Sequence, residues 1–207
     1  MEAVVGQASL ALSQSALRAC LDRAMENRAS QQQIAVVESQ LGRYPRGIVA
    51  VGAQCVCGNP LAVITRPELP GGIPFPTTCY LTSPQAVKAV SHLEAEGVMA
   101  TMNEQLAQDE NLRERYERAH RTYLAFRQLL AERLGDDQSH IEGISAGGMP
   151  KRVKCLHALV AQSLVMGPGV NPLGDQALEA VADSFSPSRC DCDQPWPQRA
   201  LAGESSL

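Results

Sequence analysis

The sequence predicts an α+β fold in which a small three-stranded sheet packs against several helices. Two observations favour this class. Segments rich in Val, Ile and Thr lie between residues 46 and 82 and are separated by the turn-rich stretches CGNP and RPELPGGIP. Helical periodicity dominates before and after them. With 207 residues and 44% hydrophobic content, the chain is long enough for one domain with a substantial core.

Residues 1–42 are expected to form a helical N-terminal arm. Apolar residues recur at helical spacing in two stripes, which are interrupted near Asn27 to Ser30. The first stripe contains Leu10, Leu17, Leu21 and Ala24, and the second contains Ile34, Val37 and Leu41.

The single α+β domain is predicted over residues 43–183. Its strands are expected at GIVAVGAQCV, LAVIT and PFPTTCYLT. Ser83 and Pro84 form an N-cap and N1 pair that predicts a helix through Ala95. Further helices are predicted over 109–134, 150–166 and 173–182. The first of them carries an apolar stripe of Leu112, Tyr116, Ala119, Tyr123, Phe126 and Leu130. The Pro- and Ser-rich stretch 184–207 is predicted to be a disordered tail.

Charge and cysteine content indicate which partners and which compartment to expect. The formal net charge is -4 and there are no lysine-rich runs, so general nucleic-acid binding is not expected. No run of eighteen apolar residues is present, and the sequence does not suggest a membrane partner. An odd number of cysteines, seven, suits a reducing compartment. We therefore expect a cytoplasmic protein.

A glycine-rich loop followed by basic residues predicts an anion site. No acidic residue occurs between Glu142 and Asp175. If a helix begins at Pro150, its free N–H groups and dipole favour a phosphate-type anion or an acidic partner. The alternative is that a carboxylate elsewhere in the fold neutralises the cations. The site would contain Ser145, Gly147, Gly148, Lys151, Arg152 and Lys154, and the sequence leaves open whether it is catalytic.

Thiol and imidazole side chains predict a metal site, with zinc favoured over an iron–sulfur cluster. The candidate ligands are Cys55, Cys57, Cys155 and His157. On a regular helix Cys155 and His157 point about 200° apart, so both reach one ion only if that turn is irregular. Cys190 and Cys192 would complete a four-thiolate set with Cys55 and Cys57. Their place in the predicted tail makes an incidental pair the preferred interpretation.

Three blocks of the sequence resemble the actinobacterial family called domain of unknown function 501. They begin at Gly47 (GIVAVGAQCVCGNPLAVITRPELPGGIPFPTTCYLT), Leu93 (LEAEGVMATMNEQLAQDENLRERYERAHRTYLAFR) and Ser145 (SAGGMPKRVKCLHALVAQSLVMGPGVNPLGD). The resemblance implies a compact cytoplasmic domain without an established activity. Members are encoded near a septum-formation initiator and an exopolyphosphatase-like enzyme, which suggests cell division or polyphosphate metabolism by association.

Two functional hypotheses follow. The first is a protein, enzymatic or not, that binds a phosphate-type anion at the glycine-rich loop. The second is a non-enzymatic, zinc-stabilised interaction module linked to cell division, with the N-terminal arm as a surface for a protein partner.

Overall fold

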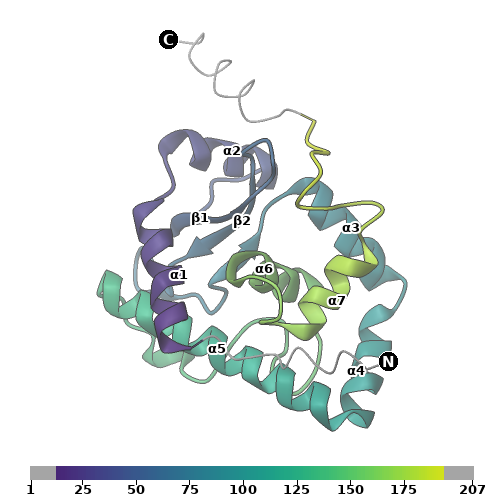
Figure 1. Cartoon of the computed structure of the whole chain (residues 1–207). Helices are drawn as coiled ribbons and strands as arrows, with labels where there is room; N and C mark the ends of the chain where they lie inside the picture. Colours follow the sequence, from purple (N-terminus) through teal and green to yellow (C-terminus); the bar gives the residue numbers. More distant parts are fainter. Residues whose placement is uncertain (1–12, 194–207) are drawn as a thin grey trace, which may run out of the picture.

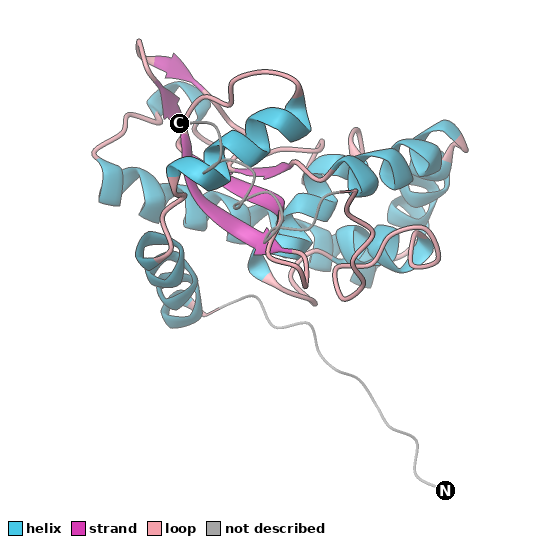
Figure 2. Cartoon of the chain, turned by 90° about the horizontal axis from the view of Figure 1, so that it is seen from above, coloured by secondary structure: helices cyan, strands magenta, loops and turns pink. Residues whose placement is uncertain are grey.

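The centre of the fold is a three-stranded antiparallel sheet in the order β1–β2–β5, as the sequence predicts (Figure 1). The structure is a computed structural model and describes residues 13–193. The strands are β1 (Ile48–Gln54), β2 (Pro60–Thr65) and β5 (Cys79–Leu81). Every residue of the central strand β2 is buried, because α6 lies against the sheet and α2 also contacts β2. Figure 2 shows helices on both sides of the strands.

A second, two-stranded hairpin lies where the sequence suggested only turns. It consists of β3 (Glu68–Leu69) and β4 (Ile73–Pro74). The hairpin region is tied to the end of α5 by an ion pair between Arg66 and Asp136 and by a hydrogen bond of 2.8 Å from the Asp137 backbone N–H to Glu68 Oε2. These polar contacts stabilise strands that are too short to be recognised from periodicity.

The N-terminal segment forms two helices, α1 (Gln14–Glu26) and α2 (Gln31–Leu41), with the break where it was predicted. α1 does not extend away from the domain. It packs on α5 and β1 and buries Leu17, Cys20, Leu21 and Ala24, so its predicted stripe is part of the main core. Leu10, the first residue of that stripe, lies outside the described residues.

Two predicted helices are confirmed, and each has a side chain that caps its N-terminus. α3 (Pro84–Ala95) begins after Ser83, whose Oγ accepts a hydrogen bond of 3.3 Å from the Ala86 N–H. α5 (Glu110–Leu134) begins after Asp109, whose carboxylate accepts one of 3.0 Å from the Leu112 N–H. The predicted apolar stripe of α5 faces the core, with Tyr116, Ala119, Tyr123, Phe126 and Leu130 fully buried. Between them lies α4 (Val98–Gln108).

The predicted helix at 150–166 is shorter than expected. α6 spans Leu156–Met166, and residues 150–154 form a turn instead. α6 lies near the centre of the molecule, in contact with all three strands of the main sheet, α3 and α7 (Pro172–Ala180) (Figure 1). A helix surrounded in this way needs apolar residues on most of its faces, and only Gln162 and Ser163 are buried polar residues in it.

The region predicted to be a disordered tail is described as far as residue 193. Phe185 is buried in the core with 3% of its surface exposed, so residues 184–193 lie against the domain. Residues 194–207 fall outside the described part of the chain. Within 13–193, none of the helices has the length and apolar character needed to cross a membrane.

Candidate metal centres

Four cysteines from two segments far apart in the sequence meet in one place. The sulfur atoms of Cys55, Cys57, Cys190 and Cys192 all lie within 4.8 Å of one another, and none of these four cysteines is in a disulfide. Around a tetrahedral zinc ion with Zn–S bonds near 2.3 Å, neighbouring sulfurs are about 3.8 Å apart. A small contraction of this thiol cluster would therefore give a four-thiolate site.

Cys55 and Cys57 are presented by the tight loop that joins β1 to β2. The Cys55 N–H donates to the Asn59 carbonyl at 2.8 Å, and the Gly58 N–H donates to the Cys55 carbonyl at 2.7 Å. Gly58 has φ +93°, a conformation that favours glycine, and this allows the chain to reverse directly after Cys57. The loop thereby fixes the two cysteines on the same side of the sheet end.

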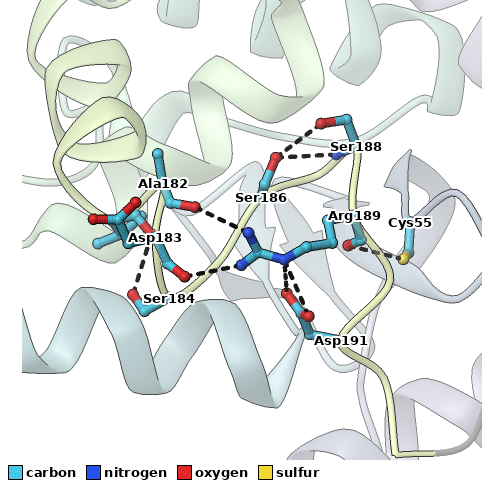
Figure 3. Close-up of polar contacts among 9 residues, drawn as sticks. Cys55, Ala182, Asp183, Ser184, Ser186, Ser188, Arg189 and Asp191 are labelled. Carbon is cyan, nitrogen blue, oxygen red and sulfur yellow. Dashed lines mark hydrogen bonds and ion pairs between the residues drawn. The ribbon is translucent and has the colours of Figure 1, made fainter.

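Arg189 anchors the segment that carries Cys190 and Cys192. Figure 3 shows the contacts of Arg189 with Ala182, Asp183, Asp191 and Cys55. Its guanidinium donates to the carbonyls of Ala182 at 3.4 Å and Asp183 at 3.1 Å, and it pairs with Asp191 at 3.0 Å. The Arg189 carbonyl in turn accepts a hydrogen bond of 3.9 Å from the Cys55 thiol. Arg189 therefore folds the segment into the turn that places both cysteines beside the loop.

The local environment disfavours uncompensated thiolates. Burial raises the pKa of Cys55 to about 12, with a hydrogen bond from the Cys57 backbone acting in the opposite direction. Burial also raises the pKa of Cys192. A buried thiolate is unfavourable unless a nearby cation compensates its charge, and a bound metal ion supplies such a charge.

The second candidate centre, the Glu94–Cys155–His157 group, is separate from the thiol cluster. Its ligand atoms also lie within 4.8 Å of one another. The structure thus divides the four predicted ligands between two places. Cys55 and Cys57 join the C-terminal cysteines, whereas Cys155 and His157 join a carboxylate from α3. The reason is topological, because the β1–β2 loop and the start of α6 present their side chains to different neighbours.

His157 is the centre of this second group. Its Nδ1 lies 3.9 Å from the Cys155 Sγ and 3.2 Å from the Glu94 Oε1. Hydrogen bonding with Cys155 and the charge of Glu94 raise the pKa of His157 to about 9, although burial acts in the opposite direction. Without a metal ion, the imidazole is therefore charged at neutral pH and forms an ion pair with Glu94.

Cys155 and His157 converge because Cys155 is not helical. It occupies the N-cap of α6 with φ -156° and ψ 111°, an extended conformation. The expectation of a 200° separation applies only when both residues lie within the helix. The later start of α6 thus removes the geometric objection to a shared ligand.

The predicted anion site required a helix that begins at Pro150, but α6 begins at Leu156. The N-terminus of α6 already has an anionic partner, because the Leu156 N–H donates to Glu94 Oε1 at 2.6 Å. Lys151, Arg152 and Lys154 are exposed and precede the helix rather than forming its first turn. The prediction that these cations stand at a helix N-terminus is wrong. Glu94 is the anion at this helix N-terminus, and the alternative, in which a carboxylate neutralises the three cations, stays a prediction.

The glycines of the loop have a packing role. Gly147 and Gly148 have φ +69° and +93°. Their carbonyls accept hydrogen bonds from Lys154 N–H at 2.7 Å and Arg152 N–H at 3.2 Å, which closes the turn on itself. A Cβ at Gly148 would lie 2.4 Å from the Arg152 carbonyl oxygen, so no side chain fits. Ser145, the remaining predicted anion ligand, instead lies 2.8 Å from the Nδ1 of His120.

Sequence reasoning missed two parts of these centres. The repeated Cys-x-Cys spacing at 55–57 and 190–192 is a signal for the thiol cluster, but the composition of the predicted tail favours an incidental pair. No sequence motif marks Glu94 as a candidate ligand, because its position beside His157 depends on the packing of α3 against α6.

Comparison with known proteins gives a family but no activity. No curated protein and no solved structure matches the chain. The model of the family described as "Protein of unknown function (DUF501)" matches residues 51–179. The match includes the whole Glu94–Cys155–His157 group and the loop with Cys55 and Cys57, and it ends before Cys190. The match covers more than half of the chain, and the protein therefore belongs to the DUF501 family.

Proposed function

We propose that this chain is a metal-binding protein in which one zinc ion is held by Cys55, Cys57, Cys190 and Cys192. The observation that carries the proposal is the convergence of four cysteine thiols within 4.8 Å from two segments far apart in sequence. Four protein ligands leave no open position on a tetrahedral ion, which is the arrangement of structural rather than catalytic zinc. The role supported by this geometry is to fasten the C-terminal segment to the sheet.

Zinc fits the cluster better than an iron–sulfur cluster does. The sulfur atoms are close enough to surround a single ion. In a multinuclear cluster each iron carries its own thiolates, and the cluster core separates the cysteines more widely. The spacing therefore favours one mononuclear ion. A closed four-thiolate ion accords with the hypothesis of a zinc-stabilised module.

The binding energy of such an ion is part of the folding energy. Cys55 and Cys57 are separated from Cys190 and Cys192 by most of the domain, so an ion that links the two pairs stabilises the packed state of the segment between α7 and residue 193. Removal of the ion is expected to loosen this segment first, because α1 to α7 retain their own apolar core.

The test is elemental analysis of protein purified without an affinity metal column. The Cys190→Ser/Cys192→Ser variant should contain one equivalent of zinc fewer than the wild type, and a chelator should lower the melting temperature of the wild type more than that of the variant. Cys20→Ser is the matched control, since Cys20 is a buried free thiol outside the cluster. Equal zinc in the wild type and the double variant would overturn the proposal. So would two disulfides in wild-type protein prepared under reducing conditions.

A further inference from the structure

We infer that Glu94, Cys155 and His157 form a second metal site, independent of the thiol cluster, in which three protein ligands hold a zinc-class divalent cation with its fourth position open. This inference does not rest on the proposed function, because the two groups of ligands share no residue.

The distances between the ligand atoms suit one tetrahedral ion. With Zn–S near 2.3 Å and Zn–N or Zn–O near 2.0–2.1 Å, the separations expected around zinc are about 3.6 Å for sulfur to nitrogen and about 3.3 Å for nitrogen to oxygen. The observed values are 3.9 Å from Cys155 Sγ to His157 Nδ1 and 3.2 Å from His157 Nδ1 to Glu94 Oε1. An ion can therefore enter without a rearrangement of the backbone.

The imidazole is oriented as metal-binding histidines are. His157 Nε2 lies 3.3 Å from the Val87 carbonyl and 3.2 Å from the Ser91 Oγ. A carbonyl only accepts hydrogen bonds, so Nε2 carries a hydrogen and donates it. This leaves Nδ1, on the side of Cys155 and Glu94, as the ligand atom. Donation of the second ring N–H to a backbone carbonyl is the usual outer-shell arrangement at metal sites.

The three ligands are held in place before any ion binds. Val87, Ser91 and Glu94 are spaced i, i+4 and i+7 on α3, so they form one stripe toward His157. The turn before Cys155 is fixed by Asn103 of α4, whose side chain accepts from the Val153 N–H at 2.8 Å and donates to the Val153 carbonyl at 3.1 Å. Such preorganisation lowers the cost of assembling a site.

The fourth position is accessible to solvent. The side chains of His157 and Glu94 are 25% and 24% exposed, so the group lies at the surface of the domain and we place solvent at its fourth position. Three protein ligands and one exchangeable water are the arrangement of catalytic rather than structural zinc. The ligand expected at the open position is water or a small anion.

Cobalt(II) is the probe that separates the two sites. In the full-length Cys190→Ser/Cys192→Ser variant, we expect one cobalt ion per chain with a thiolate charge-transfer absorption. Adding Cys155→Ser to this double variant should abolish the absorption. Adding Cys20→Ser to the double variant should leave it unchanged. A folded variant that binds no cobalt, or an unchanged spectrum without Cys155, would overturn the inference. If the double variant does not fold, the cobalt content of wild type and Cys155→Ser is compared instead, and one equivalent fewer is expected in Cys155→Ser.

Glu94→Gln distinguishes a ligand from a helix cap. The glutamine keeps a carbonyl oxygen that accepts from the Leu156 N–H, so a residue that only caps α6 would tolerate the change with cobalt affinity intact. Outer-shell partners alone are worth about 10–100-fold in metal affinity, so loss of a direct ligand should weaken cobalt binding at least about tenfold. Azide should shift the cobalt spectrum of the double variant, and the absence of any shift would overturn the open fourth position.

Discussion

The Sγ of Cys155 lies 3.9 Å from the Nδ1 of His157, although residues two positions apart in a helix point in nearly opposite directions. The contact exists because Cys155 is extended and ends the turn that Gly148 closes, while His157 already belongs to α6. The start of α6 at Leu156 therefore has two consequences. It brings the two side chains together, and it places the basic residues outside the helix.

Arg189→Ala should weaken metal binding at the thiol cluster without removing any ligand. The guanidinium positions Cys190 and Cys192 through the carbonyls of Ala182 and Asp183. Without these contacts the segment must be ordered when the ion binds, which lowers the affinity. Zinc affinity measured by chelator competition should therefore fall by about tenfold. Arg133→Ala is the control, because Arg133 is another exposed arginine in an ion pair, with Asp22. Equal affinities in both variants would contradict the positioning role.

Arg127→Met should strongly destabilise the fold. Arg127 is 1% exposed, and its guanidinium donates to Gln138 Oε1 at 3.1 Å and to the carbonyls of Pro76, Ile141 and Ile144. Each buried acceptor left without a donor costs about 1–3 kcal/mol, so we expect a loss of at least about 3 kcal/mol in urea unfolding. Arg121→Met, at an exposed i,i+4 pair, should cost less than about 1 kcal/mol. If both variants lose less than about 1 kcal/mol of unfolding free energy, the buried hydrogen bonds of Arg127 do not stabilise the fold.

Gly148→Ala and Gly143→Ala separate steric overlap from backbone strain. Both glycines have positive φ, which costs a residue with a Cβ about 1–2 kcal/mol. The added methyl at Gly143 meets nothing within 4 Å, whereas at Gly148 it lies 2.4 Å from the Arg152 carbonyl. In thermal unfolding, Gly148→Ala should therefore lower the melting temperature clearly more than Gly143→Ala. If both variants have the same melting temperature, the turn before Cys155 is more deformable than its hydrogen bonds indicate.

His120 should make the fold less stable in mild acid. It is half-buried, and burial lowers its pKa below the usual value of about 6.5; Arg121 and Arg127 add to this effect and Glu117 opposes it. The pKa of His120 is lower in the folded than in the unfolded state. The contribution of neutral His120 to the free energy of unfolding is therefore complete above pH about 6.5, and it is lost as the pH falls through the folded-state pKa.

The measurement is the melting temperature at pH about 7.5 and about 5, with chelator present so that metal release does not contribute. The fall should be smaller in His120→Gln than in the wild type. His92→Gln, at an exposed histidine of α3, should behave as the wild type does. A fall of the same size in all three proteins would exclude a contribution from His120.

The fold class and several elements were predictable because their signals are local. The stripe from Tyr116 to Leu130 repeats at helical spacing, and Ser83 with Pro84 marks a helix start within two residues. Both predictions are confirmed, as is the three-stranded sheet. The late start of α6 was missed because Pro150 is equally compatible with a turn, and the turn is selected by contacts with Asn103.

The sequence by itself determined the α+β class, the main helices and strands, and the residue types able to bind a metal, since each of these depends on neighbours a few positions away. Only the tertiary structure decided which ligands meet. Cys57 and Cys190 are separated by most of the chain, and Glu94 reaches His157 from another helix. Such encounters follow from how apolar faces pack in three dimensions, and periodicity along the chain does not encode them.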